Sequence, residues 1–158
     1  SHFVPPTVLQ PRSVRRVTAP EPDFRDDDAA AVAKELMELG VLVNTGAHGQ
    51  REGLATHWEM WSFAEGGMSP MQMLATATIN PARYLGMDAD LGSIETGKLA
   101  DLQVVDGNPL EDVKSTDRIT HVMVNGRLYR ANDLGEEVTG SRPAPTLWWH
   151  NQPQHQIR

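Results

Sequence analysis

Residues 40–61 have the sequence GVLVNTGAHGQREGLATHWEMW, and this stretch decides the fold that we predict. Three apolar residues, Val41, Leu42 and Val43, open a predicted strand over residues 41–45, which ends in a glycine-rich loop. Such runs are typical of buried parallel strands. In α/β enzymes the catalytic groups lie in loops at the carboxyl ends of these strands. His48, in the loop, is therefore the first candidate for a functional residue.

The composition restricts the class of protein. The 158 residues are 39% apolar and 22% charged, which is typical of one soluble globular domain. A net charge of −7 argues against nucleic acid or an anionic membrane as a partner. The absence of cysteine excludes disulfides, thiolate ligands and a cysteine nucleophile, although it does not identify the compartment. No apolar run reaches the length of a membrane span, and no signal-peptide pattern opens the chain.

Helical patterns flank the predicted strand. A helix beginning at the acidic residues 26–28 is expected to end at Gly40, with an apolar face made of Ala29, Val32, Ala33, Leu36 and Leu39. A second helix follows the loop and ends at residues 66–67, and its predicted inner face holds Leu54, Trp58 and Trp61. A third helix begins at Ser69, with Pro70 in its first turn and Gln72 completing a capping box; its predicted inner face holds Met71, Leu74 and Ala75.

A β module is predicted after residue 91, where turn residues and then β-branched residues replace the helical pattern. One strand is expected over residues 102–105. Residues 119–124 and 127–129 flank Asn125 and Gly126, which is the strongest short-range signal for a type I′ hairpin. The tail is polar except for the apolar residues 147–149, which we expect to anchor it on a neighbouring surface.

Three segments resemble the carboxyl-terminal part of the amidohydrolase superfamily. They are residues 69–86 (SPMQMLATATINPARYLG), 91–102 (LGSIETGKLADL) and 122–127 (VMVNGR). The resemblance covers most of residues 26–129. It is closest to the branch of imidazolonepropionase-like and prolidase-like enzymes, and within it to members with a Gly-Ala-His-Gly-Gln loop and a His-Trp-Glu helix, as at residues 46–50 and 57–59 here.

This resemblance implies an α/β fold: the carboxyl-terminal fragment of a TIM (β/α)8 barrel, together with strands of a small accessory β-sandwich. We expect an extended arm or loop (1–25), the last helix-strand-helix unit with the following helices (26–86), a β-sandwich segment (87–132) and a tail (133–158). One parallel strand has no neighbour in this sequence to take its backbone hydrogen bonds. The amino-terminal remainder of the barrel must then come from the same protein or from a separate chain.

The resemblance also implies a metal-dependent hydrolase that cleaves an amide, cyclic amide or dipeptide C–N bond. One or two divalent ions, zinc by expectation, would take most of their ligands from outside this chain. The family places an aspartate where this sequence has His48, after Gly46 and Ala47. Neutral imidazole is a good zinc ligand and a base near neutral pH, but it offers no negative charge. His48 is therefore a predicted metal ligand and catalytic residue, and the alternative is a loop cap bonded to the backbone.

Three further residues are predicted to bind substrate. Gln50 and Arg51 could orient a carboxylate or amide, and His57 could point back towards the loop from the start of its helix. Glu59 lies on a different helical face from His57, and we interpret it as a surface or capping acid. The expected partners are a small-molecule or dipeptide substrate, the remainder of the barrel and further copies in a homo-oligomer. The competing hypothesis is a catalytically silent structural or assembly segment.

Overall fold

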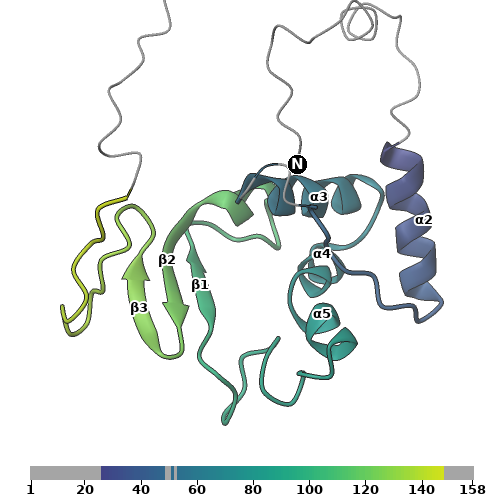
Figure 1. The fold of residues 1–158 in the computed structure, drawn as a ribbon. Helices are drawn as coiled ribbons and strands as arrows, with labels where there is room; N and C mark the ends of the chain where they lie inside the picture. Colours follow the sequence, from purple (N-terminus) through teal and green to yellow (C-terminus); the bar gives the residue numbers. More distant parts are fainter. Residues whose placement is uncertain (1–25, 49–50, 52, 148–158) are drawn as a thin grey trace, which may run out of the picture.

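A computed structural model describes residues 26–48, 51 and 53–147, and Figure 1 shows their arrangement. The elements in chain order are α2 (Asp26–Glu38), α3 (Leu54–Glu65), α4 (Pro70–Thr76), α5 (Ile79–Tyr84), β1 (Leu102–Val105), η2 (Val113–Asp117), β2 (Ile119–Val124) and β3 (Arg127–Arg130). Helix α3 is central, because it contacts α2, α4 and the short 3₁₀ helix η2. The three strands lie to one side of α3, and α2 lies to the other (Figure 1). The predicted arm, residues 1–25, and the tryptophans at 148–149 lie outside the described residues.

Helix α2 packs on α3 through the smallest side chains available. A Cβ added at Gly66 would lie 2.4 Å from the Cβ of Ala30, which is itself only 3% exposed. The predicted apolar face of α2 is not the face that packs on α3, because Val32, Leu36 and Leu39 are exposed by 53%, 41% and 81%. Ala30 and Gly66 fix a different face of α2 against α3. The bulkier apolar stripe is thereby turned away from the other described elements.

Helices α3 and α4 form where the local signals predicted them. Ser69 accepts from the backbone N–H of Gln72, whose side chain accepts from the backbone N–H of Ser69, so the capping box is confirmed. The predicted inner face of α4 is only partly right. Met73 is fully buried, whereas Met71 is 65% exposed, because the seven-residue helix turns Met73 and Thr76 towards the core. In α3 the buried residues are His57 and Met60, while Leu54 and Trp58 are about half exposed.

The predicted strand over residues 41–45 is not paired in any sheet of the described residues. These residues run without a ladder partner, and Val41 and Leu42 are 49% and 40% exposed. The physical reason is the one expected from the sequence: a strand needs a neighbouring strand for its backbone groups. The strands of the described residues form one separate antiparallel sheet of order β1-β2-β3, so residues 41–45 gain no neighbour from it.

The β module matches the predicted strands closely. Strands β2 and β3 pair antiparallel with Val122 opposite Tyr129, and β1 pairs along the other edge of β2. Asn125 and Gly126 have φ of 48° and 76°, and two successive positive φ values are the mark of a type I′ turn. The short helix η2, which precedes β2, was not predicted from the sequence.

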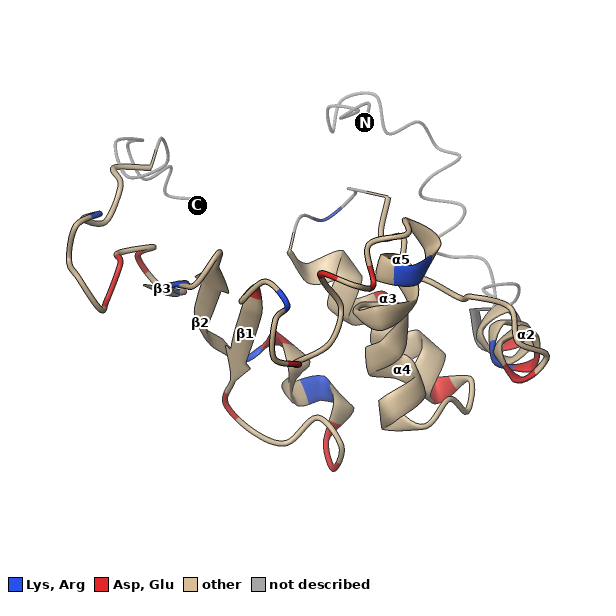
Figure 2. Cartoon of the chain, turned by 90° about the horizontal axis from the view of Figure 1, so that it is seen from below, with Lys and Arg blue, Asp and Glu red and all other residues tan. Residues whose placement is uncertain are grey.

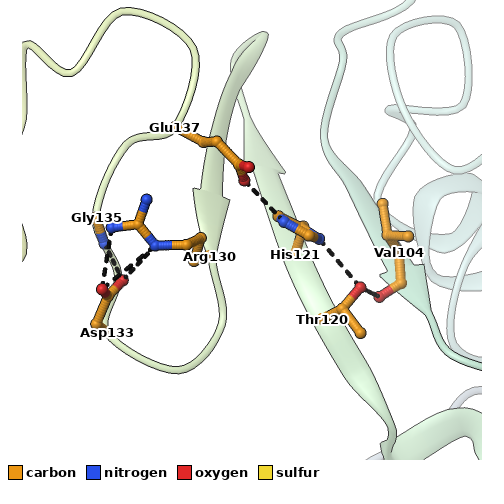
Figure 3. A network of polar contacts seen from close by, with 7 residues as sticks. All are labelled: Val104, Thr120, His121, Arg130, Asp133, Gly135 and Glu137. Atoms are coloured by element: carbon orange, nitrogen blue, oxygen red, sulfur yellow. Dashed lines mark hydrogen bonds and ion pairs between the residues drawn. The ribbon is translucent and has the colours of Figure 1, made fainter.

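The segment after β3 is held on the sheet by polar contacts, shown in Figure 3. Glu137 Oε2 lies 2.8 Å from His121 Nε2, and Arg130 pairs with Asp133 at 3.0 Å. Glu136 is 5% exposed and accepts from the backbone N–H and the hydroxyl of both Thr139 and Ser141. The Thr139 hydroxyl, then that of Ser141, lowers the pKa of Glu136 to about 2.

Charged residues are dispersed over the described part of the chain. Lys and Arg residues lie on α2, α5, η2, β3 and the loops, with Asp and Glu between them (Figure 2). Helix α4 carries no charged residue. Among the residues that the structure describes, no helix has both the length and the apolar content to cross a membrane.

Replacing both turn residues, Asn125→Ala with Gly126→Ala, should destabilise the β module. Alanine resists positive φ, and the cost is roughly 1 kcal/mol or more at each position. Amide hydrogen exchange in β2 and β3 should become faster, while metal content stays unchanged. Asn132→Ala, in an exposed turn without positive φ, is the control. Unchanged exchange in the double variant would contradict the turn assignment.

Glu136→Gln should make the β module less sensitive to acid. The folded pKa of about 2 lies below the ordinary value of 4.5. The carboxylate therefore stabilises the fold fully above about 4.5, and that stabilisation is lost as the pH falls towards 2. The wild-type amide signals of β2 and β3 should weaken over this range, whereas the variant, less stable at neutral pH, should change less. Glu111→Gln, at an exposed carboxylate, should follow the wild type; identical profiles for all three proteins would exclude this role of Glu136.

Candidate functional site

Residues 43–45 lie against the helices after α3 and are held there by helix groups. The backbone N–H and the hydroxyl of Thr45 both donate to the carbonyl oxygen of Thr76 at 2.9 Å, at the end of α4. Asn80 Nδ2 in α5 donates to the carbonyl oxygen of Val43 at 3.0 Å. Thr76 and Asn80 are both buried. The chain entering the candidate loop is therefore fixed by two buried residues.

The loop that follows is organised by one carboxylate. Glu59 Oε2, from the second turn of α3, accepts the backbone N–H of Gly46 at 2.7 Å and that of Ala47 at 2.6 Å. The next residue, His48, donates its N–H to the carbonyl oxygen of Gly46. Ala47 and His48 have φ of 38° and 48°, a left-handed conformation that side chains with a Cβ seldom adopt. Residues held in this way cluster at functional sites.

Two of the predicted site residues are exposed in or beside this loop. His48 and Arg51 are exposed, and neither side chain has a hydrogen bond or ion pair within the described part of the chain. Gln50 lies outside the described residues. His48 is thus displayed by a loop whose backbone is fixed, and its imidazole is open to a ligand or to a further part of the protein.

His57 is placed differently from His48. Its side chain is 9% exposed, and its ring lies 6.5 Å from that of Trp61, one turn further along α3. Trp61 Nε1 donates to Thr116 Oγ1 of η2 at 2.9 Å. Residues two apart lie on different faces of a helix, so His57 lies on the Trp61 side while Glu59 serves the loop. The structure describes no hydrogen bond between His57 and His48.

Two buried polar atoms lack hydrogen-bond partners among the described residues: Asn44 Oδ1 and His57 Nδ1. An unpaired buried polar atom costs about 1 to 3 kcal/mol, so such atoms are usually satisfied in the working protein. Within residues 26–48, 51 and 53–147, no three His, Asp or Glu side chains gather closely enough to hold a metal ion. A complete ligand set therefore does not lie in the described residues, and His48 could contribute one position only.

Sequence reasoning placed Glu59 as a surface or capping acid, and the capping alternative describes its contacts: it caps the two backbone N–H groups of the loop. The signal was present in the sequence. Gly46 and Ala47 follow a segment that must bend sharply, so their N–H groups need an acceptor, and Glu59 is an acid in the middle of the next helix. What the sequence could not supply is the side of α3 that faces the loop.

Comparison with known proteins identifies relatives of this site and its surroundings. A family model described as "Amidohydrolase family" matches residues 25–129. Ochratoxinase of Aspergillus niger is 29% identical over 103 residues, which is 63% of this chain and 22% of that protein. Imidazolonepropionase of Symbiobacterium thermophilum is 51% identical over 39 residues, or 25% of this chain and 9% of that protein. A crystal structure of an Xaa-Pro dipeptidase with bound methionine in the active site superposes with a TM-score of 0.59 and 35% identity, covering 64% of this chain and 25% of the dipeptidase. The chain thus spans a quarter or less of the length of these relatives.

Proposed function

Because this chain belongs to the amidohydrolase family, we propose that it forms the carboxyl-terminal part of a metal-dependent hydrolase that cleaves an amide, cyclic amide or dipeptide C–N bond. The observation that carries the proposal is the extent of the family match, which runs from just before α2 to the end of the hairpin. The likeness to an Xaa-Pro dipeptidase over 64% of this chain supports the choice of bond.

In this proposal, residues 26–86 are the last helix-strand-helix unit of an eight-stranded barrel with the helices that follow, and residues 87–132 belong to the accessory β-sandwich. The tail begins at 133, and residues 1–25 precede the unit as an arm. Two features support the barrel. Val41 and Leu42 lie exposed in an extended stretch with no ladder partner among the described residues, and the apolar stripe of α2 is also exposed. Strands and helices of the amino-terminal part of the barrel would cover both the extended stretch and the apolar stripe of α2.

His48 is the residue of this chain that we propose to act at the reacting centre. It follows the extended stretch directly, which is where barrel enzymes place catalytic groups. Its neutral imidazole could complete a ligand set or accept a proton from water. Gln50 and Arg51, in the same loop, would orient a substrate carboxylate or amide, and His57 would support the substrate side of the site. The divalent metal of such an enzyme, zinc by expectation, polarises the scissile carbonyl, and most of its ligands would come from outside this chain.

The competing proposal is a catalytically silent segment that serves assembly. It is favoured by the histidine at the position where family resemblance led us to expect a carboxylate. The two proposals differ in metal content: the complete protein, with its amino-terminal part, should hold one or two divalent ions per copy if it is a hydrolase. Elemental analysis of that protein without added metal tests the difference. A metal-free protein that does not hydrolyse dipeptides or cyclic amides after zinc addition would contradict the hydrolase.

This chain alone should not behave as a stable monomer. The exposed apolar residues Val32, Leu36, Leu39, Val41 and Leu42 form too large an uncovered area beside a small core. We expect association or aggregation of the isolated chain in sedimentation experiments, and a complex of one-to-one stoichiometry with the amino-terminal part when that part is supplied. A cooperative, monomeric unfolding transition of the isolated chain would contradict the fragment proposal.

In the complete enzyme, His48→Ala should reduce turnover by roughly 10²-fold or more, as expected for loss of a positioned acid–base group, with folding nearly intact. His48→Asp restores the acid that the resemblance led us to expect. Activity retained by the aspartate variant would support a ligand or base role, and a loss equal to that of alanine would favour a role specific to imidazole. Full activity of His48→Ala, measured beside His121→Ala on the sheet as control, would remove His48 from the mechanism.

A further inference from the structure

We propose that Glu59 is a positioning residue that sets the place of His48 by holding the backbone of its loop. The inference rests on the proposed function, in which His48 acts on metal or substrate. The side chain of Glu59 makes its two hydrogen bonds among the described residues to the backbone N–H groups of Gly46 and Ala47, so it would act through His48.

The two hydrogen bonds converge on one oxygen atom. Gly46 N lies 2.7 Å and Ala47 N 2.6 Å from Glu59 Oε2, which are short distances for N–H donors. Hydrogen bonds to an ionised carboxylate are roughly twice as strong as those between neutral groups. Two adjacent N–H groups that point at one atom also fix the orientation of both peptide planes. The direction in which the chain leaves Ala47 is thereby determined.

The loop needs this support because its conformation is unfavourable by itself. Ala47 and His48 are successive residues with positive φ and neither is glycine. The buried anchors further back, Thr76 and Asn80, hold the chain only as far as Thr45. Beyond Thr45, the described hydrogen bonds of residues 46–48 are the two to Glu59 and the one that closes the loop on itself. Without Glu59 the loop is free to relax, and His48 moves with it.

Glu59 is suited to this task because it projects from a fixed element. Its neighbour Met60 is 5% exposed, and Trp61, which lies beside His57, bonds the opposite side of α3 to η2. A functional group supported by residues on a packed helix is held more tightly than one supported by a second loop. The Glu59 side chain therefore fixes the backbone of the loop relative to α3.

The test uses the complete enzyme with Glu59→Gln, Glu59→Ala, His48→Ala and the double variant Glu59→Ala with His48→Ala. The glutamine carbonyl can still accept both N–H groups without charge, so its effect should lie between those of wild type and alanine. Glu59→Ala should lower kcat by about 10²-fold with a smaller change in KM, because a displacement of about 1 Å has an effect of that size. Amide exchange at Gly46 and Ala47 should become faster. Glu65→Gln, at an exposed acid on the same helix, is the matched control.

The double variant separates positioning from other roles. If Glu59 acts through His48, the double variant should be no less active than His48→Ala alone. Losses that multiply would overturn the inference, because Glu59 would then act independently. An inactive His48→Ala beside Glu59 variants with wild-type kcat would overturn the role of Glu59 and leave the proposed function standing. A fully active His48→Ala would overturn the proposed role of His48, and this inference with it.

Discussion

Backbone N–H and C=O groups that lack a neighbouring strand need other hydrogen-bond partners, and this requirement shapes the chain between α2 and α3. Residues 43–47 satisfy it with a helix carbonyl, an asparagine amide and a carboxylate instead of a neighbouring strand. The three partners come from α4, α5 and α3 in turn. Packing of these helices around Met60 and Met73 therefore decides where the loop lies, and the loop decides where His48 is displayed.

The apolar face of α2 also lacks a covering element among the described residues. The contact between Ala30 and Gly66 brings α2 so close to α3 that no larger side chain fits between them. Because α2 packs on α3 through the face that holds Ala30, the side chains of Val32, Leu36 and Leu39 are exposed to solvent. Exposed apolar stripes of this kind mark surfaces that another element covers. The family match over residues 25–129, together with coverage of only 25% of the dipeptidase structure, fits a chain whose further contacts lie beyond its own sequence.

Local signals sufficed for much of the fold. The capping box at Ser69 and the turn at Asn125 and Gly126 act over a few residues, so the sequence could predict the helix start and the hairpin. The inner faces of α2 and α4 and the state of residues 41–45 depend on which distant elements pack there, and the sequence pattern does not contain that information. At the candidate site, the sequence predicted a functional role for His48, which stays a prediction. It could not predict that Glu59 faces that loop, since only the orientation of α3 decides this.

Trp61 is one of the residues that hold the orientation of α3 about its own axis, beside the packing of α3 on α2 and α4. The indole N–H of Trp61 donates to Thr116, the ring lies tilted beside that of His57, and Lys114 Nζ lies 5.9 Å from its ring centroid. Successive residues of an α-helix are offset by about 100°, so a small roll of α3 would swing Glu59 away from Gly46 and Ala47. The hydrogen bond from Trp61 to η2 therefore helps to keep α3 in the rotation that directs Glu59 towards the loop. The β module thus affects the position of the loop through η2, Trp61 and Glu59, although no strand is hydrogen-bonded to the loop among the described residues.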